Sequence, residues 1–65
     1  MQPYRIELQY DPSTDKSSYL VTLGRDVIAS GTPPRDPSMC WAEGEAKYLA
    51  RVHAKRDDVT YEIVR

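Results

Sequence analysis

Cys40 and His53 carry the most reactive chemistry in this chain, because an imidazole can activate a thiol as a nucleophile. They are its only cysteine and its only histidine, and they stand 13 positions apart in a stretch with a helical pattern. On one helix this spacing separates them by about 20 Å along the axis, and their directions around the axis differ by about 140°. A Cys–His dyad within one molecule therefore requires a break in the helix, and we expect no enzymatic activity.

The remaining types of chemical site lack their residues. One cysteine and one histidine cannot supply the four ligands of a structural zinc ion. The chain has no glycine-rich phosphate loop and no paired carboxylates. Cys40 has no second cysteine to resolve an oxidised thiol, so we expect an ordinary exposed thiol. His53 is expected to pack or to cap the end of the helix. We expect no catalytic residue, no cofactor and no metal.

The element that positions these residues is a helix predicted between Asp36 and His53. Asp36 suits the N-cap, and Pro37 suits the first helical position, where its missing N–H costs nothing. A helical wheel predicts that the sheet-facing arc contains Trp41, Ala42, Leu49, Val52 and His53, with Ala46 and Tyr48 at its margins. The opposite side is predicted to carry Glu43, Lys47, Arg51 and Lys55.

Alternating residues predict the strands. Residues 4–10 place Tyr4, Ile6, Leu8 and Tyr10 on one side and polar residues on the other. Residues 11–18 form a polar loop that Asp11 can close with an Asx turn. Residues 19–23 and 27–30 are two further strands, and Gly24 favours a tight hairpin between them over one continuous strand.

Residues 59–64 alternate again and predict a last strand. The expected fold class is therefore a single α+β domain over residues 1–65, with two layers in the order βββαβ. Its antiparallel sheet would be covered on one face by the single helix. Tyr4, Tyr10 and Tyr61 share the periodicity of the apolar residues, so we expect the helix to cover them. This placement argues against a tyrosine platform that stacks nucleic-acid bases.

Size and charge restrict the function further. A chain of 65 residues has a thin core, and small domains without disulfides or metals commonly gain stability from a partner or from self-association. The formal net charge is −1, and basic residues form no block of the kind that binds a phosphate backbone. The start of the chain has no signal-peptide pattern and no run reaches the length of a membrane span, so we expect a cytoplasmic protein.

Glu45 is unusual because the wheel places it between Trp41, Leu49 and Val52. A carboxylate there must reach the rim, find a partner such as Arg56 or a basic residue of the sheet, or contact another protein. All three alternatives stay open from the sequence.

A family resemblance rests on the run Tyr19-Leu20-Val21-Thr22-Leu23, the run from Val27 to Thr32, and a helix with Ala42, Glu43 and Ala46. This pattern resembles the small HicB-like antitoxins, in which a strand pair leads into an Ala- and Glu-rich helix. The chain departs from them at residues 33–37 and lacks their Leu-Pro-Gly-Cys segment and their appended DNA-binding domain. The resemblance implies a βββαβ fold and an antitoxin role.

The first functional expectation is a non-enzymatic protein-binding module, such as an inhibitor or antitoxin-like factor of a phage or other mobile element, with homodimerisation as a further expectation. The candidate partner-binding residues are Glu43, Glu45, Lys47, Arg51 and Lys55. The alternative is nucleic-acid binding through basic residues, which are Arg35, Lys47, Arg51, Lys55 and Arg56.

Overall fold

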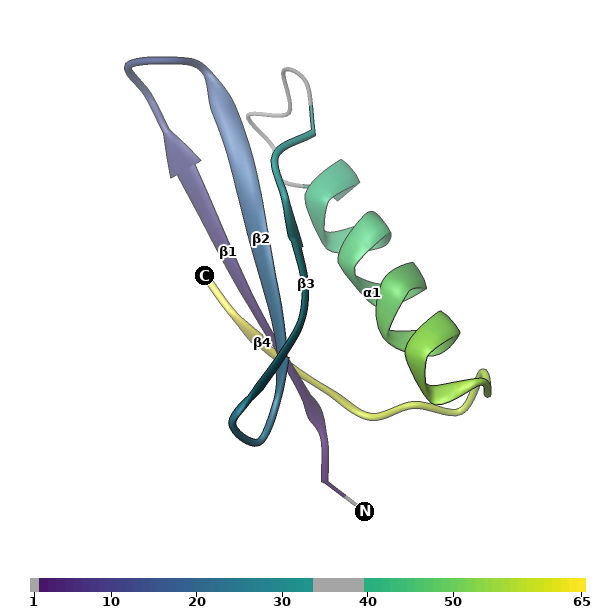
Figure 1. The fold of residues 1–65 in the computed structure, drawn as a ribbon. Coiled ribbons are helices and arrows are strands. Elements are labelled where there is room, and N and C mark those ends of the chain that lie inside the picture. Colours follow the sequence, from purple (N-terminus) through teal and green to yellow (C-terminus); the bar gives the residue numbers. More distant parts are fainter. Residues whose placement is uncertain (1, 34–39) are drawn as a thin grey trace.

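The fold is a four-stranded sheet with one helix on one face (Figure 1). The computed structural model describes residues 2–33 and 40–65. Along the chain the elements are β1 (Tyr4–Asp11), β2 (Lys16–Leu23), β3 (Asp26–Gly31), α1 (Cys40–Ala54) and β4 (Tyr61–Val64). The strand order in the sheet is β3-β2-β1-β4, so β3 and β4 form its two edges. The expected α+β class and βββαβ order are confirmed.

The prediction of an antiparallel sheet was wrong for the last strand. β2 pairs antiparallel with both β1 and β3, but β4 pairs parallel with β1. The reason is the connection through α1. The chain returns along the helix from the end of β3 and enters β4 in the direction of β3, which is also the direction of β1 (Figure 1). A strand, a helix and a strand in this order make a parallel crossover.

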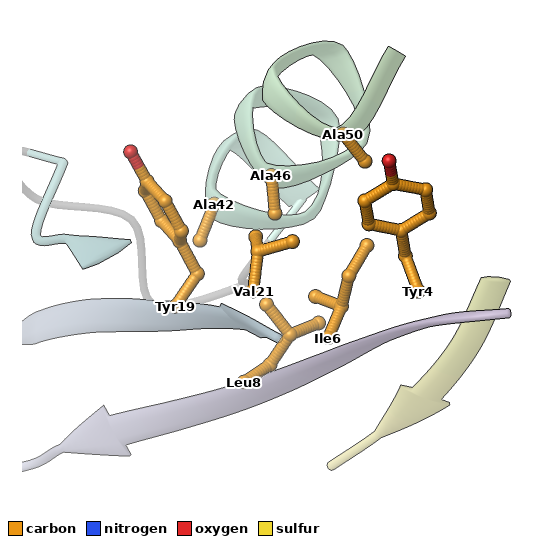
Figure 2. Packing of buried hydrophobic residues seen from close by; sticks show 8 residues of the cluster. All are labelled: Tyr4, Ile6, Leu8, Tyr19, Val21, Ala42, Ala46 and Ala50. Carbon is orange, nitrogen blue, oxygen red and sulfur yellow. The ribbon is translucent and has the colours of Figure 1, made fainter. Parts of the chain in front are cut away.

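The alternation in β1 produces the core as expected. Tyr4, Ile6 and Leu8 are buried and meet Tyr19 and Val21 of the antiparallel β2. Figure 2 shows these side chains standing on the sheet toward the helix. Tyr10, which was also expected beneath the helix, is exposed near the hairpin end of β1 and donates a hydrogen bond to Asp15. The helix side of the sheet thus holds the large apolar residues of the core.

Both predicted turns are confirmed. The backbone amide and the hydroxyl of Ser13 donate to Oδ1 of Asp11 at 2.9 and 2.7 Å, which is the expected Asx turn. These hydrogen bonds lower the pKa of Asp11. Gly24 has a φ of +63° between β2 and β3, a conformation that glycine adopts without the steric cost of a Cβ atom. β2 begins at Lys16, three residues earlier than its apolar run.

The predicted orientation of the helix was wrong. The fully buried residues of α1 are Ala42, Ala46 and Ala50, and Figure 2 shows them pointing at the sheet. Trp41, Val52 and His53, expected in the buried arc, are exposed instead. Leu49 packs at the edge of the core. We call Ala42, Ala46 and Ala50 the alanine row. This row, and not the predicted apolar arc, is the face of α1 that packs on the sheet.

The structure describes the C-terminal end of the helix but not the predicted N-terminal turn. The predicted N-cap at Asp36 and the first turn at Pro37 lie outside the described residues. At the other end Lys55 adopts a φ of +60° and donates its backbone amide to Arg51 at 2.8 Å. A left-handed residue after the last helical turn satisfies a terminal carbonyl and stops the helix.

Candidate interaction surface on the helix

The solvent-facing side of α1 carries three large apolar side chains. Trp41 is 58% exposed, Tyr48 is 57% exposed and Val52 is 54% exposed. Their spacings of seven and four residues bring them onto one line along the helix. We call Trp41, Tyr48 and Val52 the outer stripe. It lies on the side of the helix opposite the alanine row.

The size of the sheet residues explains why the helix lies this way. Tyr4, Ile6, Leu8, Tyr19 and Val21 already fill the space above β1 and β2. A helix can approach such a surface closely only with small side chains, because a packed interior has no room for additional methylenes. The alanine row meets that condition, and the larger residues of α1 are left facing solvent.

A polar network joins one flank of α1 to β4 and to the end of the chain. Glu43 forms ion pairs with Lys47 at 3.0 Å and with Arg65. Lys47 lies 5.6 Å from the ring centroid of Tyr61 in β4, and Arg51 donates to the Tyr61 hydroxyl at 3.2 Å. Glu43, Lys47 and Arg51 were expected on the side away from the sheet, yet they are half-buried and contact β4 or its C-terminal neighbour. The prediction missed this because the alanine row, and not the apolar arc, faces the sheet.

On the opposite flank of α1, the Glu45 side chain accepts a hydrogen bond from the sheet. The Tyr19 hydroxyl donates to Oε1 of Glu45 at 3.2 Å. Burial of the phenol, followed by the hydrogen bond and the charge of Glu45, raises the pKa of Tyr19. A tyrosine of β2 is thus the partner, in place of the Arg56 or sheet cation that the sequence suggested.

Gly31 makes room for this hydrogen bond. It lies beside Tyr19 in the β2–β3 register. A Cβ atom at position 31 would come within 2.6 Å of the Tyr19 hydroxyl oxygen and 2.9 Å of the ring carbon that bears it. The absence of a side chain on β3 therefore lets the Tyr19 ring reach across to the helix.

Basic residues surround the C-terminal end of the outer stripe. A shallow depression of about 300 Å³ is lined there by Tyr48, Arg51, Val52, Lys55, Arg56 and Asp57. Arg56 is held by Asp58 through two contacts of 2.7 Å. Their hydrogen bonding lowers the pKa of Asp58 to about 2 and raises that of Arg56. The structure thus brings Lys55 beside the stripe, whereas much of the charge of Arg56 is compensated locally.

The two residues considered for catalysis lie at opposite ends of one continuous helix. Cys40 is its first residue and is exposed. His53 lies in the last turn, where Nδ1 is 2.8 Å from the Tyr4 hydroxyl and the two rings meet edge to face. Because α1 has no break between them, they cannot form a dyad within one molecule. His53 is exposed, and its contact with the core is this one with Tyr4.

No helix within residues 2–33 and 40–65 combines the length and the apolar character needed to cross a membrane. In the same ranges no cluster of three or more His, Cys, Asp or Glu residues could hold a metal ion. No protein-family model, curated protein sequence or solved structure matches the chain. We therefore infer the function from the geometry of this molecule.

The outer stripe is the surface that sequence reasoning missed. The sequence did contain a pattern that indicates the buried face, because Ala42, Ala46 and Ala50 recur at four-residue intervals. Such a row of small residues marks a helix face that approaches its neighbour closely. The wheel gave more weight to large residues and so pointed Trp41 inward.

Proposed function

We propose that this chain is a non-enzymatic protein-binding module that presents the outer stripe of α1 to a partner protein. One observation carries the proposal: the helix buries alanines and exposes a tryptophan, a tyrosine and a valine. An amphipathic helix in a lone small domain is expected to do the reverse, since burying large apolar side chains contributes more to folding than burying alanine.

The composition of the outer stripe supports a protein as the ligand. Tryptophan and tyrosine are enriched in the centres of protein–protein interfaces, and arginine contributes at the same sites. Arg51 and Lys55 stand beside Tyr48 and Val52 around the depression at the end of the stripe. An apolar line with a basic border fits a helix or chain segment that has apolar anchors and acidic neighbours.

A narrower version of the proposal is a cytoplasmic inhibitor or antitoxin-like factor of phage or mobile-element type. Its support is the βββαβ order of the elements together with the sequence resemblance to HicB-like antitoxins. Both supports concern the fold, and one fold serves many functions. The partner-binding role of Glu45 and Lys55 belongs to this version, because both border the outer stripe.

Nucleic-acid binding is the less favoured function. Among the basic residues considered for it, Arg35 lies outside the described residues, Lys47 is paired with Glu43, and Arg56 is paired with Asp58. Local carboxylates of this kind reduce the positive potential that a phosphate backbone requires. The mixed surface of Arg5 and Glu7 on the uncovered side of the sheet gives no alternative basic patch.

Affinity capture with matched variants tests the proposal. The tagged chain, its Trp41→Ala and Tyr48→Ala variants, and a Val27→Ala control are used to capture proteins from a bacterial lysate that also contains the untagged chain. Val27 is 66% exposed on β3, away from α1. We expect a stoichiometric protein that wild type and the control retain and both stripe variants lose. Capture that is unchanged by both stripe variants would contradict the assignment of the surface.

A further inference from the structure

We propose that the occupant of the outer stripe is the outer stripe of a second copy of this chain, with the two α1 helices antiparallel about a twofold axis at Tyr48. This inference rests on the proposed function, since it names the partner of the same surface. Its basis is the symmetric spacing and the complementary chemistry of the residues around Tyr48.

The spacing is symmetric about Tyr48. Trp41 lies seven positions before it and Lys55 seven positions after it, which is about 10 Å in each direction along a helix. Gly44 and Val52 lie four positions to either side, or about 6 Å. A twofold axis through Tyr48 therefore brings Trp41 level with Lys55 of the second copy, and Gly44 level with Val52 of the second copy.

The side chains that meet in this arrangement suit one another. The two Tyr48 rings meet at the axis, where offset stacking of aromatic rings is favourable. Lys55 of one copy can lie against the indole of Trp41 in the other, and tryptophan is the best aromatic partner for a cation. A Cβ atom on Gly44 would have no neighbour within 4 Å, so this position leaves room for the Val52 side chain of the other copy.

The shape of the molecule permits the pairing. α1 covers one face of the sheet (Figure 1). The exposed outer stripe lies on the side of α1 opposite the buried alanines that face the sheet. Two copies joined through this face form a sheet–helix–helix–sheet stack in which neither sheet obstructs the other. A line of seven-residue spacing also suits helices that cross at a small angle.

The interface gives the thin core an additional apolar layer. The helix contributes only alanines to the fully buried core, so the dimer would bury the large apolar residues that the single chain cannot. The surface area that one helix face per copy can bury is small compared with the roughly 1,200–2,000 Å² buried in stable complexes. We therefore expect a dimer with a dissociation constant in the micromolar range.

Charge exchange at Tyr48 tests the twofold axis directly. Sedimentation velocity is recorded from about 10 to about 500 µM for wild type, Tyr48→Lys, Tyr48→Glu and an equimolar mixture of the two variants. Wild type is expected to pass from one to two chain masses with rising concentration. Each variant alone places like charges face to face and is expected to stay at one chain mass, whereas the mixture places opposite charges together and restores two.

Two controls accompany the measurement. Val27→Lys introduces the same charge on β3, outside the stripe, and is expected to associate like wild type. Circular dichroism of each variant checks the fold, which an exposed position such as Tyr48 should tolerate. If a Tyr48 variant fails this check, Trp41→Ala and Lys55→Ala replace it, and both are expected to weaken association at least tenfold.

The inference is overturned if wild type remains at one chain mass throughout, or if it associates and the charged variants associate equally. It is also overturned if the mixture of folded variants stays at one chain mass. These outcomes are distinct from failure of the proposed function. A monomeric chain that still captures a different protein through Trp41 retains the function and loses only the second copy as occupant.

Discussion

At the scale of single residues, the contact of Tyr19 with Gly31 and Glu45 links three elements. Tyr19 stands on β2, crosses the backbone of β3 at Gly31 and donates to Glu45 on α1. The position of the buried Tyr19 ring therefore depends on the missing side chain at Gly31. The sequence spacing of the two residues does not predict this contact. Substitutions at either residue should disturb the attachment of the helix.

Gly31→Ala is expected to destabilise the fold by about 1–3 kcal/mol, because the new Cβ atom must push the Tyr19 ring aside. The matched control is Gly44→Ala in the exposed middle of α1, where a Cβ atom meets nothing within 4 Å. That change should instead stabilise the helix by about 1 kcal/mol. Urea unfolding of the dilute chains measures both, and equal stability of Gly31→Ala and wild type would refute the contact.

Tyr19→Phe is expected to cost about 1 kcal/mol at neutral pH through loss of the hydrogen bond to Glu45. The folded pKa of Tyr19 is raised above its ordinary 10.0, so the unfolded chain releases this proton first as the pH increases. The stabilisation is therefore complete below pH 10.0 and is lost as pH rises through the folded pKa.

The measurement is the free energy of unfolding of wild type and Tyr19→Phe between neutral and alkaline pH. The difference between them should shrink as the pH rises above 10.0. Tyr10, whose pKa is also raised by its hydrogen bond to Asp15, is present in both proteins and cancels. A difference that is independent of pH would mean that the Tyr19 phenol has no special environment.

At the scale of elements, we expect substitutions on the sheet-facing side of α1 to destabilise the fold and substitutions on its exposed side to have little effect. Ala46→Leu inserts methylenes where Ala46 is fully buried and should destabilise by about 1–3 kcal/mol. Trp41→Ala removes a much larger side chain from an exposed position and should change the stability of the dilute chain by no more than about 0.5 kcal/mol. Urea unfolding of both variants provides the comparison, and the reverse order would place the wrong face on the sheet.

The strands were predictable from the sequence because their signal is local. The alternation of Tyr4, Ile6 and Leu8 and the turn residues Asp11 and Gly24 each specify their own conformation without reference to the remainder of the chain. The direction of β4 was not predictable in this way. It depends on how far the chain has travelled through α1 before it rejoins the sheet, which no local pattern encodes.

The orientation of α1 failed for a related reason. A helical wheel assumes that the most apolar arc is buried in the same chain. Here the space above the sheet was already occupied by Tyr4, Tyr19 and the aliphatic residues between them, so the smallest side chains faced inward. The candidate residues Glu43, Lys47 and Arg51 consequently moved from the expected outer face to the network with Tyr61.

At the scale of the whole molecule, one sheet and one helix leave large surfaces without a second layer. The side of the sheet away from α1 is mixed, with Arg5 and Glu7 paired at 3.2 Å and Val27 of β3 exposed. The outer stripe, in contrast, exposes apolar area that water solvates poorly. We therefore assign the protein partner, and the second copy proposed as that partner, to the outer stripe, where three large exposed apolar side chains stand in one line.

Trp41 reports on that surface directly, since it is the only tryptophan of the chain. The decisive measurement is acrylamide quenching of its fluorescence across a dilution series. In the dilute chain we expect strong quenching and an emission maximum close to that of free tryptophan in water, because the indole is 58% exposed. Quenching should weaken as the concentration rises and copies pair. A tryptophan already protected in the dilute chain would contradict an outward-facing stripe, and quenching that never changes with concentration would contradict the pairing.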